Sequence, residues 1–340
     1  MGDQLLDITI GLTFCFAFVN GFHDGGNVVA TIIASRSMRP VSALLLASSA
    51  EFAGPLLLGT AVAQTMAGSI LEPSMLELAS ADKVYVIVMC ALAGAIAWKL
   101  PSWYLGLPSS ASHALLGGLV GAGVVCMGTS CVVVDKLVRG VILPLLLSPL
   151  AGIVLGFLVF SMIRGLCRTA HRGIGHLFRA LQRPTMIALA AGHGSNDAQK
   201  SMGLIAIALA AGTGEMHGQL VLPGWVIWGC AGALAVGLTL GGLRLVRTVG
   251  FGISRLEPVH SFASQFTALS VVLSTSLLGG PVSTSQIVAS SVMGVGASRR
   301  LSGVRWSSAS SIVMAWLLTV PVCALVSAGL YWVLGPILAP

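Results

Sequence analysis

The sequence predicts an all-α membrane protein built from two related halves. Of its 340 residues, 56% are hydrophobic and only 9% are charged, whereas soluble domains carry about 25% charged residues. A soluble chain of this length could not bury so much apolar surface, because its surface-to-volume ratio is too high. The apolar runs are long and continuous rather than alternating, which favours membrane helices over a β-barrel. Two motifs each occur twice, and the two copies of each are separated by the same number of residues, which predicts that the chain consists of two related halves.

Ten segments are long and apolar enough to be considered as crossings, since a transmembrane helix needs about 20 apolar residues. Several of them contain Gly, Pro or polar residues that a helix facing lipid would not carry. We therefore expect about five crossings in each half, some of them broken or re-entrant helices. The ten segments are 5–33, 41–67, 84–100, 105–126, 137–163, 185–211, 222–243, 259–278, 281–297 and 307–334.

Basic residues mark one side of the membrane. If the N-terminus lies outside, the inner loops carry most of the basic residues, whereas the outer loops are mainly acidic. The positive-inside rule then places both termini outside and segment 164–183 in the cytoplasm, with the chain in a bacterial inner membrane. Because these charges sit in short loops between apolar runs, they indicate membrane orientation and not nucleic-acid binding. The inner residues are Arg36, Arg39, Lys99, Arg164, Arg168, Arg172, Arg179, Arg183, Arg244, Arg247, Arg255, Arg299, Arg300 and Arg305, and the outer acids are Glu72, Glu77, Asp82, Asp135 and Glu215.

Two motifs occur twice, and both pairs are separated by 173 residues. Segment 21–27, Gly-Phe-His-Asp-Gly-Gly-Asn, resembles segment 194–200, Gly-Ser-Asn-Asp-Ala-Gln-Lys. Segment 106–113, which contains Pro-Ser-Ser-Ala-Ser-His, resembles segment 279–286, which contains Pro-Val-Ser-Thr-Ser-Gln. The alternative is two coincidences in a chain rich in Gly and Ser. Since five crossings per half is an odd number, we expect halves 1–163 and 184–340 to be inverted, as in many secondary transporters.

The first motif places one aspartate, Asp24 or Asp197, inside an apolar run of each half. A carboxylate in the bilayer core costs several kcal/mol unless it is paired or hydrated. It could cap a broken half-helix, or it could bind a cation or a proton beside an anionic substrate. The symmetric placement favours the second interpretation. Neighbouring glycines predict that the helix is unwound at this point, which is tolerated where backbone lines a buried or wet cavity. These glycines are Gly21, Gly25, Gly26 and Gly194.

The second motif predicts a half-helix N-terminus in each half. Pro108 and Pro281 suit the first turn of a helix, and free N–H groups at such an end bind anions. Hydroxyl groups that follow each proline add hydrogen-bond donors, which suits a tetrahedral oxyanion. In a single copy, these hydroxyls would more simply bond back to their own helix, but two matched copies favour a binding site. The candidate hydroxyls are Ser110, Ser112, Ser283, Thr284 and Ser285.

Further ionisable residues lie in or beside these motifs. Lys200 follows Asp197 by three residues, so it can neutralise that carboxylate or add charge to an anion site, although it could also reach the membrane interface. Glu51 could join a cation site or hydrogen-bond a neighbouring helix. Histidines beside the motifs could relay protons or make helix contacts. These histidines are His23, His113 and His193.

The duplicated motifs resemble those of the inorganic phosphate transporter (PiT) family. The family signature Gly-Ala-Asn-Asp-Val-Ala-Asn is similar to segments 21–27 and 194–200, and its Leu-Pro-Val-Ser-Thr-Thr-His motif is similar to 107–113 and 280–286. Segment 304–321 also resembles the family's C-terminal end, so the resemblance covers nearly the whole chain. It implies symport of phosphate with sodium or protons, in bacterial members often as a metal–phosphate complex. It further implies that the substrate and cation site is lined by Asp24, Asn27, Asn196 and Asp197, with the five hydroxyls beside the anion.

Three positions depart from the family pattern. His23 stands where the family often has Asn, Lys200 stands where animal members have Asn, and Gln286 replaces a His. The lost oxygen ligands and the added ammonium argue against a sodium site like that of sodium-coupled members. We therefore hypothesise proton coupling, with Lys200 supplying the charge of a cation. The candidate coupling residues are Asp24, Asp197, Glu51 and His23.

Other function classes fit the sequence less well. An intramembrane aspartyl protease would need two aspartates sharing a proton and usually a Gly-x-Gly-Asp motif, which this sequence lacks. An anion channel or a cation transporter is a better rival, and some PiT relatives carry sulfate. We therefore expect a transporter and no enzyme, with no metal site and no cofactor besides a co-transported proton or sodium ion. Its expected partners are phosphate or sulfate and the lipid bilayer, and a homodimer stays open.

Overall fold

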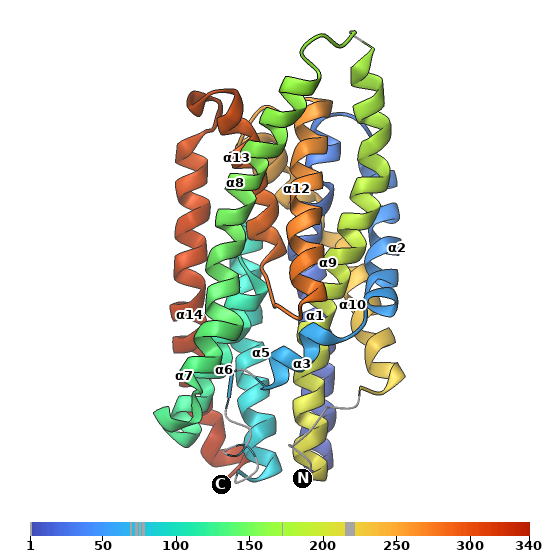
Figure 1. Cartoon of the computed structure of the whole chain (residues 1–340). Coiled ribbons are helices and arrows are strands. Elements are labelled where there is room, and N and C mark those ends of the chain that lie inside the picture. Colours follow the sequence, from blue (N-terminus) through green and yellow to red (C-terminus); the bar gives the residue numbers. More distant parts are fainter. Residues whose placement is uncertain are drawn as a thin grey trace.

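The protein is an elongated bundle of helices (Figure 1). The computed structural model describes residues 2–68, 70, 71, 74, 76, 79–171, 173–214 and 222–340. Within these residues every regular element is a helix, apart from two isolated β-bridges. The expected all-α class is therefore confirmed. Four charges used to predict the orientation lie outside the described residues, namely Glu72, Glu77, Arg172 and Glu215.

Among the described residues of the first half, four helices, α1, α2, α5 and α8, are long enough to cross a membrane, and the others are shorter. The predicted crossing 41–67 is divided at Gly59, whose φ of 79° ends one helix before the next begins. The elements are α1 (Gly2–Ala34), α2 (Pro40–Leu58), α3 (Ala61–Gly68), α5 (Ala81–Tyr104), α6 (Ala111–Met127), η1 (Thr129–Cys131), α7 (Val134–Leu137), η2 (Val138–Ile142) and α8 (Leu143–Leu166).

The second half begins with the longest helix, which spans 40 residues. Segment 174–183, expected to belong to a cytoplasmic loop, forms the first part of this helix. The elements are α9 (Ile174–Thr213), α10 (Gly224–Gly241), α11 (Leu243–Val246), η3 (Arg247–Gly252), α12 (Pro258–Leu277), α13 (Thr284–Arg299), η4 (Leu301–Gly303) and α14 (Trp306–Leu338).

Six of the described helices are long and apolar enough to cross a membrane: α1, α2, α5, α8, α10 and α14. This confirms a membrane protein with several transmembrane helices. The other predicted crossings differ in character. Helix α6 has only 17 residues, and α9 carries buried polar and charged side chains along its middle. Polar helices pass through the same bundle because the surrounding apolar helices separate them from lipid.

Local backbone geometry repeats at the spacing of the two motifs. Helices α5 and α12 end at Tyr104 and Leu277, which are 173 residues apart. Two residues later, Gly106 and Gly279 have φ values of 71° and 73°, a left-handed conformation that glycine adopts without steric cost. The chain then runs extended to α6 and α13, which begin at equivalent positions.

The prolines of the second motif do not lie in a first helical turn, so that prediction is wrong. Pro108 and Pro281 precede α6 and α13 by three residues and belong to the extended segments. The N-cap residues are Ser110 and Ser283, whose hydroxyls accept hydrogen bonds from N–H groups three residues later. A serine satisfies a free N–H at this position, whereas a proline ring favours extended backbone before it.

The predicted unwinding at the two aspartates is also wrong, because α1 and α9 continue through both motifs. The glycines instead allow neighbouring backbones to approach. A Cβ at Gly21 would lie 1.9 Å from the carbonyl oxygen of Leu234 in α10, and one at Gly194 would lie 2.2 Å from that of Glu51 in α2. Small residues serve this purpose in membrane bundles, where close packing drives helix association.

Helices from the two halves are interleaved. Helix α1 packs along α10 and α9 packs along α2, whereas α6 packs on α14 and α13 on α8. Helix α1 runs away from the end that holds both termini, and α9 runs back towards it (Figure 1). Each of these four contacts joins one helix from each half. The centre of the bundle is therefore formed jointly by both copies of the motifs.

Candidate functional site

The first aspartate lies in a fully enclosed ion pair. The Asp24 side chain is 1% exposed, and its Oδ2 accepts a hydrogen bond of 2.7 Å from Nζ of Lys99 in α5. Its Oδ1 lies 2.6 Å from Nδ1 of His23, the residue before it. The other ring nitrogen of His23 lies 3.1 Å from Ser102 Oγ and 3.3 Å from Ser109 Oγ. Asp24 is thus connected to segment 106–113, which with segment 279–286 forms the two Pro–Ser motifs.

The second aspartate has a similar set of partners. Asp197 Oδ1 accepts a hydrogen bond of 2.5 Å from Nζ of Lys200, one turn along α9. The same ammonium donates to the carbonyl oxygen of Val282, at 2.8 Å, in the extended segment before α13. Asp197 Oδ2 accepts from Nδ2 of Asn20 at 3.0 Å. It also lies 3.2 Å from Nε2 of His193, at ion-pair distance but without hydrogen-bond geometry.

Glu51 joins this cluster from α2. Its Oε1 lies 2.5 Å from Nδ1 of His193, while its Oε2 is buried without a hydrogen-bond partner. His193 therefore lies between the carboxylates of Glu51 and Asp197. Glu51 is fully buried, so its contact with His193 joins α2 and α9 inside the bundle.

The two aspartate motifs belong to one buried cluster. Asn20, one helical turn before Asp24 on α1, donates to Asp197 on α9. A bond between α1 and α9 therefore joins the motif regions of both halves. Lys99, Lys200, Asp24 and Asp197 are each at most 1% exposed. Such ion pairs in a low-dielectric interior depend on complete pairing, because an uncompensated buried charge costs several kcal/mol.

The N-termini of α6 and α13 meet beside this cluster. Ser112 Oγ, in the first turn of α6, donates to the carbonyl oxygen of Val282 at 3.1 Å. His113 Nδ1 lies 3.2 Å from Gln286 Nε2, which belongs to the first turn of α13. The first N–H groups of a helix have no partner within it, and they carry the positive end of the helix dipole. Two such ends, both buried, can hold an anion without a full cationic charge.

The remaining predicted residues are all buried but differ in their bonds. The Asn196 amide donates to Ser276 Oγ and to the carbonyl oxygen of Gly280, and so supports the extended segment. Both polar atoms of the Asn27 side chain and Oγ1 of Thr284 have no hydrogen-bond partner. Ser285 is 2% exposed. Unpartnered polar atoms in a buried position indicate groups that are available to a ligand.

Lys99 was missed as a site residue, because its place near the end of an apolar segment suggested a positive charge at the membrane surface. The structure corrects this assignment: Lys99 is fully buried and pairs with Asp24. Two signals could have identified it. No charged residue follows it before Leu105, and Asp24, unlike Asp197, has no lysine nearby in the sequence. A buried carboxylate requires a partner.

The cluster is nearly balanced in charge. Three carboxylates, on Asp24, Asp197 and Glu51, face two ammonium groups and the imidazoles of two histidines. One proton shared among the histidines makes the sum zero. Further charge placed in this low-dielectric environment would be costly unless it were paired.

Comparison with known proteins identifies the family. The profile described as "Phosphate transporter family" matches residues 20–174 and 167–327. The chain is 35% identical to a Bacillus subtilis (strain 168) protein named "Probable low-affinity inorganic phosphate transporter", over 98% of this chain and 99% of the relative. A Rhizobium meliloti (strain 1021) protein with the same name is 38% identical, over 95% and 94% of the two chains.

A solved structure is similar over the whole fold. It is named "The sodium-dependent phosphate transporter", and it matches with a TM-score of 0.88 and 26% identity over 98% of this chain and 100% of that one. The fold and its paired motifs thus define a membrane transporter, and not a protease. The chain belongs to the phosphate transporter family, which confirms the resemblance noted in the motifs.

Proposed function

We propose that this protein is a secondary active transporter that carries inorganic phosphate together with protons across the cell membrane. The observation that carries the proposal is the pairing of both motif aspartates with buried lysines next to two helix N-termini. The helix ends and their hydroxyls bind the anion. The aspartate, lysine and histidine groups bind the proton that accompanies it.

Two inverted repeats, 1–163 and 184–340, form the transport unit. Support comes from the recurrence of helix ends, left-handed glycines and serine caps at a spacing of 173 residues. The opposite directions of α1 and α9 also support it (Figure 1). Inverted repeats bind substrate near the bilayer midplane at their interface. The proposed orientation has both termini outside and segment 164–183 in the cytoplasm.

Proton coupling is supported by the partners of the carboxylate oxygens. All four oxygens of Asp24 and Asp197 lie next to a nitrogen donor group. Lys200 donates to both the Asp197 carboxylate and the carbonyl oxygen of Val282. Carboxylate and carbonyl oxygens are the ligands that a sodium ion would need, so the ammonium takes the place of that ion. Dihydrogen phosphate adds one negative charge to the cluster, and one proton on a second histidine compensates it. A proton therefore travels with each phosphate.

Sodium coupling is the second candidate function. It is favoured by the similarity to a structure named as a sodium-dependent phosphate transporter. Under that alternative, the unpartnered oxygens of Asn27, Thr284 and Glu51 would contribute ligands to the ion. The two candidates bind the same anion and differ in what drives its accumulation.

Uptake into proteoliposomes tests the proposal. Labelled phosphate is supplied outside under an imposed pH gradient without sodium, and separately under a sodium gradient at equal pH with a protonophore. We expect concentrative uptake in the first case only, with weak competition by sulfate. Uptake driven by sodium alone would favour the second candidate, and downhill flux without accumulation would indicate a channel. Complete inhibition by equimolar sulfate would identify a sulfate carrier.

A further inference from the structure

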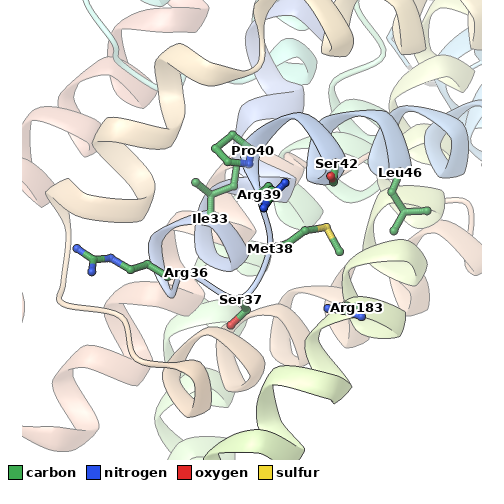
Figure 2. A pocket seen from close by; sticks show the side chains of 9 residues that line it. All are labelled: Ile33, Arg36, Ser37, Met38, Arg39, Pro40, Ser42, Leu46 and Arg183. Atoms are coloured by element: carbon green, nitrogen blue, oxygen red, sulfur yellow. The ribbon is translucent and has the colours of Figure 1, made fainter.

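A basic pocket lies between the end of α1, the start of α2 and the first part of α9 (Figure 2). It is at the end of the bundle opposite to the two termini (Figure 1). Its volume is about 840 Å³, within the range of small-molecule sites. The side chains that decide its chemistry are Arg36, Arg39 and Arg183 together with the apolar Ile33, Met38 and Leu46.

The three arginines of the pocket have no acidic partner among the described residues. All three side chains are exposed, and in the described part of the chain no carboxylate lies within ion-pair distance of their guanidinium groups. In Figure 2, Arg36 and Arg183 lie on opposite sides of Ser37, although 147 residues separate them in the sequence. In Figure 2 the Arg36 side chain points away from the other two arginines, so Arg39 and Arg183 are the groups placed to attract a phosphate, which guanidinium binds with two parallel hydrogen bonds.

The other wall of the pocket is apolar and continues onto the outer face of α2. Leu46 lines the pocket and is 37% exposed, and its neighbours Val41 and Leu45 are exposed on the same helix. Helix α2 is among the helices apolar enough to cross a membrane. A free phosphate ion gains nothing from such a wall. A molecule with a phosphate head and an apolar tail contacts both parts of the pocket.

We propose that this pocket binds the headgroup phosphate of an anionic phospholipid, with the acyl chains lying along the exposed face of α2. Basic pockets between membrane helices on the cytoplasmic side bind anionic lipid headgroups in this manner. The site is separate from the buried Asp24–Asp197 cluster. The proposal rests on the proposed orientation, which places this end of the bundle in the cytoplasm, but not on the transported substrate or the coupling ion.

The floor of the pocket connects it to one further helix, α12. Ser37 Oγ accepts a hydrogen bond of 3.0 Å from Nε2 of Gln182, the residue before Arg183. Oε1 of Gln182 accepts hydrogen bonds from the hydroxyls of Ser35 and Ser261, and its Nε2 also donates to the carbonyl oxygen of Pro258. A lipid that binds the pocket therefore stabilises the contact of α1, α9 and α12 at this end. Its binding is expected to raise the thermal stability of the whole protein.

Lipid binding to the purified full-length protein tests the proposal. Phosphatidylglycerol, phosphatidylcholine or inorganic phosphate is titrated in neutral detergent. Bound lipid is counted by native mass spectrometry, and the melting temperature is followed by tryptophan fluorescence. The test variant is Arg39→Gln/Arg183→Gln. The matched control is Arg179→Gln, which removes an exposed arginine one turn from Arg183 that does not line the pocket.

We expect phosphatidylglycerol to bind and stabilise the wild type and Arg179→Gln, and phosphatidylcholine to do neither. A basic residue near the membrane contributes about 1 kcal/mol to such binding, so each removed arginine weakens it roughly fivefold. The double variant then binds about 25-fold more weakly. Equal binding by the double variant and the wild type would overturn the proposal. It would also be overturned if inorganic phosphate alone gave the arginine-dependent stabilisation, or if the wild type bound both lipids equally.

Discussion

Nδ1 of His113 and Nε2 of Gln286 lie 3.2 Å apart, although 173 residues separate them in the chain. The two residues occupy equivalent positions in the two Pro–Ser motifs. Under the proposed repeat relation, equivalent residues can contact each other only close to the axis that relates the two halves. Their contact therefore locates the N-termini of α6 and α13 where both halves can act on one anion.

Removal of Lys99 is expected to stop transport and to destabilise the fold. Lys99→Met leaves Asp24 buried without its ammonium partner, and breaking a buried pair costs about 3–5 kcal/mol. The double variant Asp24→Asn/Lys99→Met removes both charges, so it should regain most of the lost thermal stability without regaining phosphate uptake. Melting temperature in detergent and uptake in proteoliposomes are the two measurements. Lys83→Met in the first turn of the same helix is the matched control, and it should behave like the wild type.

If Lys83→Met and Lys99→Met gave equal stability and equal uptake, the charge of Lys99 would have no role in the site. A double variant less stable than both single variants would show that the two side chains do not act as a pair.

Lys200→Asn is expected to change the coupling ion. This substitution removes the ammonium that contacts Asp197 and the Val282 carbonyl, and it adds a neutral oxygen ligand. We expect uptake by the variant to lose its dependence on the pH gradient and to become stimulated by external sodium. The measurement compares initial rates with sodium and with choline at equal pH. An active variant that stays driven by the pH gradient and indifferent to sodium would contradict the assigned role.

The motif glycines are expected to be sensitive to any added methyl group. In Gly21→Ala the new Cβ would overlap the Leu234 carbonyl oxygen, and overpacking of this kind costs about 1–3 kcal/mol or more. Gly11→Ala lies on the same helix with no atom within 4 Å of the new Cβ, so it should be neutral or slightly stabilising. Thermal melting in detergent compares the two variants. Equal melting temperatures would mean that α1 and α10 can separate at little cost.

The Thr284 hydroxyl is expected to bind the anion directly. Because Oγ1 has no partner in the protein, Thr284→Val should leave stability nearly unchanged. Loss of a hydrogen bond to a charged group costs about 1.5–3 kcal/mol, so the KM for phosphate should rise roughly tenfold or more. Ser291→Ala is the control, since that hydroxyl bonds back to Ile287 of its own helix. A KM unchanged in Thr284→Val would remove this hydroxyl from the site.

The all-helical membrane class followed directly from composition, but the positions of the helix breaks did not. Glycines near Asp24 and Asp197 were interpreted through their low helix propensity, whereas the structure uses them for close contact with α10 and α2. A membrane environment satisfies no backbone group, so a helix continues through glycine unless a partner replaces its hydrogen bonds. Whether a glycine unwinds its helix or allows a close helix contact depends on where the neighbouring carbonyl group lies. The sequence alone does not give that position.

For the candidate site, the sequence indicated which residues matter but not all of their partners. The spacing of 173 residues related Asp24 to Asp197 and Ser110 to Ser283, because repeats preserve local structure. Lys99 has no counterpart at that spacing, where Val272 stands, so symmetry could not reveal it. Its pairing with Asp24 arises from the packing of α5 against α1, which is a tertiary contact.

Initial uptake of labelled phosphate by Asp24→Asn and Asp197→Asn tests the central claim most directly. The rates are measured in proteoliposomes and normalised to the amount of inserted, monodisperse protein, so that any loss of folding is accounted for separately. Each substitution keeps the size of the side chain but removes the carboxylate that balances a buried lysine. We predict that both variants insert into the membrane and that neither accumulates phosphate. Uptake at the wild-type rate by either variant would contradict the account.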